Sequence, residues 1–136
     1  MILSLQNVDA FYGNIHAIKG LDMEIQNGEI VTLIGSNGAG KTTTLSSIIG
    51  IKKISGGSIV FEGENMTGKA PHEIVKKGIS LSPEGRMVFP ELTVLENLRI
   101  GAYLNKDKEQ VKKDYEYVFE LFPRLEERKT QLAGTL

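Results

Sequence analysis

The chain has 136 residues, and its 16 lysines and arginines against 17 aspartates and glutamates give a formal net charge of −1. This length suggests one small domain, and a hydrophobic fraction of 40% is enough for a packed core. The near-neutral charge predicts no nucleic-acid-binding surface. The absence of cysteine excludes disulfides and thiolate metal sites, and two histidines are too few for a His-rich metal site. Without a signal peptide or an apolar run of roughly 18 residues, the chain is expected to be a soluble cytoplasmic protein.

Glycine and charge are distributed in opposite ways. Thirteen of the 15 glycines lie in residues 1–85, whereas residues 86–136 carry 18 of the 33 charged side chains. The sequence therefore predicts a Gly-rich first part built mainly of strands, residues 1–85, and a charged second part built of helices, residues 86–136.

Short strands are predicted in the first part. Residues 2–8 form one, with Leu3 and Leu5 on one face and Ser4 and Gln6 on the other, and residues 21–26 alternate in the same way. Asn27-Gly28 then predicts a hairpin. Residues 30–34 are nearly all apolar and β-branched, which is typical of a strand that is covered on both faces. Residues 58–61 predict a further short strand.

Helices follow the glycine loop and fill the second part. Residues 41–49 contain no glycine or proline and predict a helix, and residues 71–77 predict a short one that begins at a proline. A small strand is expected at residues 79–81. Thr93 and Glu96 have the spacing of a capping box at the start of a helix. Residues 108–122 carry apolar side chains at helical spacing, so we expect an amphipathic helix with this stripe packed in the core.

One segment predicts a phosphate-binding loop. It matches the pattern G-x-x-x-x-G-K-[ST] and follows an apolar strand and precedes a helix, as a P-loop does. Its residues are Gly35, Ser36, Asn37, Gly38, Ala39, Gly40, Lys41 and Thr42.

Each residue type in this loop has a chemical reason. The glycines let the backbone N–H groups approach phosphate oxygens at the start of a helix, where an anion is favoured. Lys41 supplies a positive charge to the β and γ phosphates, and the Thr42 hydroxyl is a ligand for Mg²⁺. Thr43 is placed to donate to the α phosphate. The sequence therefore predicts ATP and Mg²⁺ as cofactors.

The surrounding residues resemble a known family. The first part of the chain is similar to the start of an ABC-transporter ATP-binding subunit in the segments LSLQNV, FYG, AIKGL, NGEI and GSNGAGKTTTL. A later segment resembles the branched-chain amino-acid importer branch of that family, and its sequence is LSPEGRMVFPELTVLENL. The resemblance covers nearly the whole chain. It implies an α/β P-loop NTPase of the ABC ATPase type, with an antiparallel β subdomain and the start of a helical subdomain.

The resemblance also assigns individual residues. Tyr12 matches the aromatic residue that stacks on adenine, with strand packing as the alternative. Glu84 stands in the loop that touches Mg²⁺ and the attacking water, where most of the superfamily has glutamine; the alternative is a solvated loop acid. The segment from Arg86 to Leu98 matches a docking surface for membrane permease subunits, with an ordinary amphipathic cap as the alternative.

The resemblance further implies a dimer with a homologous ATPase subunit, an indirect partnership with a periplasmic binding protein, and a location on the inner face of the cell membrane. A hydrolase of this type also needs an acid at the end of an apolar strand. Residues 59–62 mimic such a run, but we interpret them as a hairpin. In the family, the signature motif and the catalytic acid follow the position of Leu136, so the chain is expected to be a truncated ATPase that binds nucleotide and hydrolyses it poorly. The alternatives are a non-catalytic nucleotide-binding module and the ATPase of a lipid or polysaccharide exporter.

Overall fold

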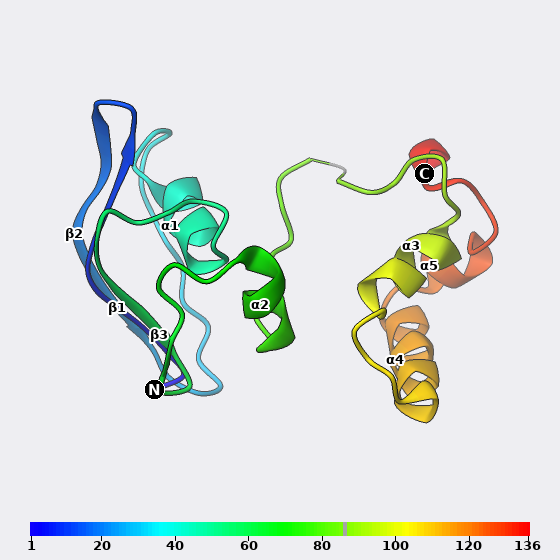
Figure 1. Cartoon of the computed structure of the whole chain (residues 1–136). Helices are drawn as coiled ribbons and strands as arrows, with labels where there is room; N and C mark the ends of the chain where they lie inside the picture. The colour runs from blue at the N-terminus through cyan, green and yellow to red at the C-terminus, as the bar shows by residue number, and fades with distance from the viewer. Residues whose placement is uncertain (86) are drawn as a thin grey trace. The chain divides into compact units, whose positions relative to one another are not determined.

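The computed structural model describes residues 1–85 and 87–136. They form two units, Met1–Leu81 and Ser82–Leu136. The first unit contains an antiparallel sheet and two helices, and the described residues of the second form helices and no strand (Figure 1). The division into functional parts at residue 85 that the sequence suggests stays a prediction.

The sheet of the first unit has four strands in the order β2-β1-β3-β4. They are β1 (Leu3–Tyr12), β2 (Ile15–Ile25), β3 (Gly56–Phe61) and β4 (Glu64–Asn65), and each neighbouring pair is antiparallel. The strands predicted at residues 2–8, 21–26 and 58–61 are present, but β1 and β2 are longer than predicted. They continue until Tyr12 pairs with Ile15 across a two-residue turn.

The first strand changes the face of its buried residues halfway along. Leu3 and Leu5 are buried at odd positions, whereas Val8 and Ala10 are buried at even ones. The register shifts between Leu5 and Val8, and Asn7 has a positive φ of 46°. A bulge inserts one residue and reverses the alternation, so β1 keeps its apolar side chains on the same side of the sheet.

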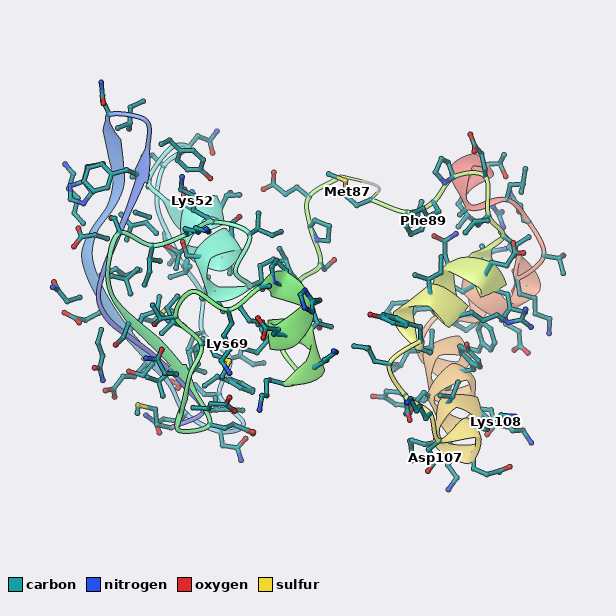
Figure 2. All side chains as sticks on the ribbon, viewed as in Figure 1. Lys52, Lys69, Met87, Phe89, Asp107 and Lys108 are labelled. Carbon is teal, nitrogen blue, oxygen red and sulfur yellow. The ribbon has the colours of Figure 1, made fainter. Side chains whose placement is uncertain are left out.

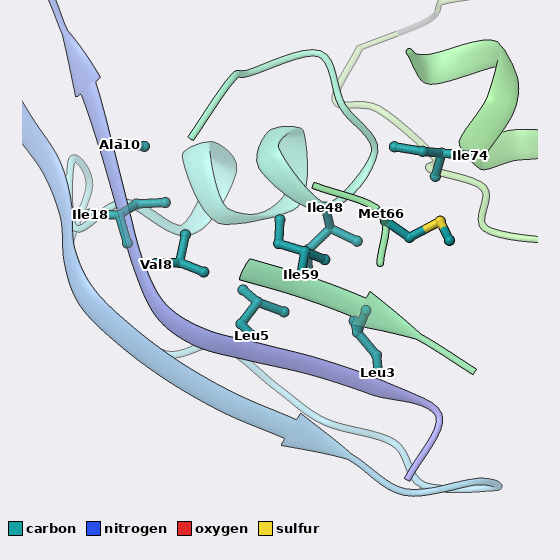
Figure 3. Close-up of a cluster of buried hydrophobic side chains, with 9 residues drawn as sticks. All are labelled: Leu3, Leu5, Val8, Ala10, Ile18, Ile48, Ile59, Met66 and Ile74. Atoms are coloured by element: carbon teal, nitrogen blue, oxygen red, sulfur yellow. The ribbon is translucent and has the colours of Figure 1, made fainter. Parts of the chain in front are cut away.

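The core of the first unit lies between this sheet and two helices, α1 (Lys41–Ile48) and α2 (Pro71–Lys76) (Figure 3). Side chains from β1, β2 and β3 meet Ile48 of α1 and Ile74 of α2, and Met66 completes the cluster. Ser4, predicted on the opposite face from Leu5, is also buried, at 1% exposure. It lies on a central strand between Glu24 and Val60, and its small side chain is covered by its neighbours.

Two predicted strands are wrong. Residues 30–34 and 79–81 form no strand, and Ile30 and Ile34 are 96% and 93% exposed. A strand of this composition is stabilised by hydrogen bonds and side-chain packing from neighbouring strands. Among the described residues no segment pairs with residues 30–34. Asn27-Gly28 therefore forms a turn but no hairpin.

Helices α1 and α2 match their predicted limits to within one residue. The first helix of the second unit is α3 (Val94–Gly101), where Thr93 and Glu96 form the predicted capping box. It continues with α4 (Lys108–Leu121), α5 (Pro123–Glu127) and a 3₁₀ turn, η1 (Ala133–Thr135). The chain returns after α5, so that Val94 N–H donates to the Gln131 carbonyl at 3.0 Å.

The apolar stripe on α4 was predicted to lie in the core. Val111, Tyr115, Val118 and Phe119 are only half-buried, Phe122 at the end of the stripe is 57% exposed, and α4 contains no buried residue. The prediction of a core stripe is therefore wrong. Among the described residues, no helix combines the length and the apolar character that crossing a bilayer requires.

Candidate functional site

The predicted phosphate-binding loop leads directly into α1. Gly40 is the N-cap of this helix and has a φ of +88°, and Gly38 has a φ of +87°. Residues with a side chain rarely adopt this left-handed backbone, whereas glycine does so readily. Glycine therefore stands at the two positions of the loop, 38 and 40, where the backbone has a positive φ.

The loop presents free hydrogen-bond donors where α1 begins. Within the described part of the chain, the backbone N–H groups of Gly38, Gly40, Lys41 and Thr42 donate no hydrogen bond. The first N–H groups of a helix have no partner within that helix, and the helix dipole adds partial positive charge at the same end. This arrangement fits an anion such as phosphate.

The ammonium of Lys41 lies over the start of its own loop. Its Nζ atom donates to the carbonyl oxygens of Gly35 and Ser36 at 2.6 and 2.8 Å. Ala39 N–H donates to the Ser36 carbonyl at 3.1 Å, which closes the turn between them. A full positive charge is thus held beside the free N–H donors of the loop.

The three threonines that follow Lys41 differ in exposure. Thr42 is exposed, so its hydroxyl is accessible as an oxygen ligand for Mg²⁺. Thr43 and Thr44 are buried, and the Thr44 hydroxyl donates to the Gly40 carbonyl at 2.9 Å. The predicted bond from Thr43 to the α phosphate stays a prediction, as does the binding of Mg²⁺ by Thr42.

Tyr12 lies at the end of β1, and the residue is 50% exposed. The ammonium of Lys52, a residue that the sequence analysis did not select, lies 3.8 Å from the centre of its ring. Nothing in the sequence places position 52 beside position 12, because the contact depends on the loop after α1.

The neighbouring Phe11 instead stacks on His16, with ring centres 4.1 Å apart. His16 is half-buried, and its Nε2 contacts Asp9 Oδ1.

Glu84 belongs to the second unit and is exposed, whereas Thr42 belongs to the first. A joint contact of the two with one metal ion therefore stays a prediction. No group of three histidine, aspartate or glutamate side chains that could hold a metal occurs in the described residues. Glu62, at the end of the apolar run 59–62, lies in the turn between β3 and β4, as the sequence predicts.

The predicted docking segment begins at Arg86, which lies outside the described residues. Met87, Val88 and Phe89 follow it, and they are exposed apolar side chains. The side chain of Asn97 fixes this loop, since its Oδ1 accepts from Phe89 N–H at 2.8 Å and its Nδ2 donates to the Phe89 carbonyl at 3.0 Å. A groove of about 340 Å³ lies here within the second unit. It is lined by Met87, Val88, Phe89, Val94, Asn97, Leu98, Leu125, Ala133 and Leu136.

Curated proteins with similar sequences are transport ATP-binding proteins. The chain is 48% identical to the high-affinity branched-chain amino acid transport ATP-binding protein BraG of Pseudomonas aeruginosa, over 99% of this chain and 58% of that protein. It is 36% identical to the probable branched-chain amino acid transport ATP-binding protein LivF of Archaeoglobus fulgidus, over 99% of this chain and 57% of that protein. The chain thus spans somewhat more than half the length of these relatives.

Solved structures of ATP-binding cassettes share the fold. A nucleotide-free cassette from an ABC transporter superposes with a TM-score of 0.82 at 30% identity, over 99% of this chain and 58% of that one. The ADP conformation of an ABC transporter cassette gives the same values. The sequence model described as ABC transporter matches residues 18–134, a range that includes the whole phosphate-binding loop. The chain therefore belongs to the ABC transporter family.

Proposed function

We propose that the chain binds ATP at residues 35–43 as part of the ATP-binding subunit that powers a branched-chain amino-acid importer. The observation that carries this proposal is the set of free backbone N–H groups at the start of α1, with the Lys41 ammonium beside them. The ADP-bound cassette with the same fold supports nucleotide binding. The printed functions of the two relatives support the branched-chain amino-acid importer.

Each residue has a defined task in this proposal. The loop N–H groups donate to phosphate oxygens, and Lys41 balances the charge of the β and γ phosphates. The Thr42 hydroxyl supplies an oxygen ligand to Mg²⁺, which neutralises phosphate charge when it is bound. Glu84 is a separate candidate for contact with the metal or the attacking water. Tyr12 offers a flat ring on which adenine stacks.

Hydrolysis by these 136 residues is proposed to be slow. A P-loop hydrolase positions water and metal with an acid at the end of a strand beside the loop. Among the described residues, the apolar run that ends in Glu62 forms a hairpin of the antiparallel sheet instead. Phosphate release that depends on Mg²⁺ and reaches an ordinary ATPase rate would contradict this and would exclude a binding-only module.

The partners proposed are a homologous ATPase subunit, which completes the nucleotide site as a dimer, and membrane permease subunits, with a periplasmic binding protein acting through them. The apolar groove beside residues 87–89 supports permease docking, since exposed apolar patches commonly mark protein-interaction sites. This partnership places the chain at the inner face of the cell membrane.

A titration with a fluorescent ATP analogue tests nucleotide binding. Lys41→Ala removes the charged donor to phosphate, and such bonds contribute about 1.5–3 kcal/mol, so the affinity is expected to fall at least about tenfold. Lys76→Ala is the matched control, because Lys76 is an exposed lysine of α2 outside the loop. Equal affinity of Lys41→Ala and the parent chain would contradict the assignment.

A further inference from the structure

The contact between Lys52 and Tyr12 has no role in the nucleotide site described so far. Lys52 Nζ lies 3.8 Å from the centre of the Tyr12 ring, within the range of a cation–π interaction. An ammonium at this distance covers one face of the ring. Tyr12 as a whole residue is 50% exposed, so it still offers surface to a planar ligand.

Lys52 is held in place by the helix that carries the phosphate-binding loop. It lies in the loop that follows α1 (Figure 2), and its backbone N–H donates to the Ser46 carbonyl of that helix at 2.9 Å. Its side chain is half-buried, although lysine is usually exposed. The first residue of α1 is Lys41, so this one helix supports both the phosphate-binding lysine and the lysine on the Tyr12 ring.

We propose that Lys52 is a positioning residue for the nucleotide base: it fixes the Tyr12 ring from one side so that adenine stacks on the other. This inference rests on the proposed binding of ATP. A ring that is already held in one orientation loses less conformational freedom when the base binds, and ordering one free side chain weakens affinity by about two- to tenfold. Lys52 acts through Tyr12 and not through the phosphates.

The contribution of the base can be separated from that of the phosphates by comparing two ligands. Calorimetric titrations with ATP and with inorganic tripolyphosphate, both without metal, measure binding with and without the adenine ring. Lys52→Met keeps the length of the side chain and removes the charge. It is expected to weaken ATP about two- to tenfold and to leave tripolyphosphate unchanged, whereas Lys52→Arg is expected to retain the affinity of the parent. Lys53→Met, at the exposed neighbouring lysine, is the matched control.

The outcomes of this experiment distinguish the two proposals. Unchanged ATP affinity in Lys52→Met, or an equal loss for both ligands, would overturn the positioning role while leaving nucleotide binding intact. If Lys41→Ala leaves both ligands as tightly bound as in the parent chain, the proposed function itself fails, and the inference fails with it.

A double-mutant cycle provides a second test that does not depend on one variant. Tyr12→Leu removes the ring. If Lys52 acts through this ring, then Lys52→Met or Lys52→Gln causes no further loss of ATP affinity in the Tyr12→Leu background. A loss of the same size with and without the ring would show that Lys52 contributes by another route and would overturn the proposal.

Discussion

Replacing Gly40 by alanine is expected to lower the free energy of unfolding by about 2–5 kcal/mol. Gly40 has a φ of +88°, and a Cβ atom added there would lie 2.7 Å from the backbone oxygen of Ala17 on β2. The left-handed backbone costs a residue with a side chain about 1–2 kcal/mol. Overpacking that forces backbone to move costs about 1–3 kcal/mol more, and the sum gives the expected loss.

Gly38 provides the matched control for this measurement. Its φ of +87° is nearly the same, but a Cβ atom added there would meet nothing within 4 Å. Gly38→Ala is therefore expected to lose only the backbone contribution, about 1–2 kcal/mol. Urea unfolding followed by far-ultraviolet circular dichroism measures both variants against the parent chain. Equal losses for Gly38→Ala and Gly40→Ala would refute the close approach of the loop to β2.

Three further predictions concern stability. Ser47→Ala is expected to stabilise the chain by about 0.5–1 kcal/mol, because the Ser47 hydroxyl is buried without a hydrogen-bond partner among the described residues and alanine favours helices. A loss of stability in urea unfolding would show that this hydroxyl is bonded. Asp107→Ala is expected to lower the free energy of unfolding by about 0.5–2 kcal/mol, because Asp107 Oδ1 accepts from two N–H groups in the first turn of α4 at 3.0 and 3.1 Å. Asp107→Asn should recover most of this loss. Equal losses for both variants would argue against Asp107 as the N-terminal cap of α4. Hydrogen bonds from Lys69 and then Lys77 lower the pKa of Glu64 to about 2, so its contribution to stability is present above a pH of about 4.5 and is lost as the pH falls toward 2. The difference in unfolding free energy between the parent and Glu64→Gln should shrink over that range, and a constant difference would contradict the ion pairs.

The limits of α1, α2 and α4 and the start of α3 could be predicted because their signals are local. The capping box at Thr93 and Glu96, the proline that opens α2 and the glycine loop before α1 all act within a few residues of where they occur. The loop at residues 35–42 could be located for the same reason, since its pattern is contained in consecutive positions, and its binding of phosphate stays a prediction.

Features that depend on contacts between distant segments were not predictable in this way. Residues 30–34 have the composition of a buried strand. Composition indicates that these side chains favour burial, but it does not show whether neighbouring strands are present to pair with them. The bulge at Asn7 reverses the alternation of β1, and the sequence shows it only as a change in spacing from Leu3 and Leu5 to Val8 and Ala10. Lys52 reaches Tyr12 because the loop after α1 turns back toward β1, and no pattern in either segment indicates this.

The position of Lys41 determines what its substitution measures. Its ammonium bonds the carbonyls of Gly35 and Ser36, so a phosphate that draws it away replaces two neutral acceptors by a charged one. Charge-assisted bonds are stronger than neutral ones, and the exchange therefore favours binding. Lys41→Ala also removes the two bonds that tie the loop together. Measuring the free energy of unfolding beside the affinity separates this loosening of the loop from the lost phosphate contact, since only the loosening alters the chain without nucleotide.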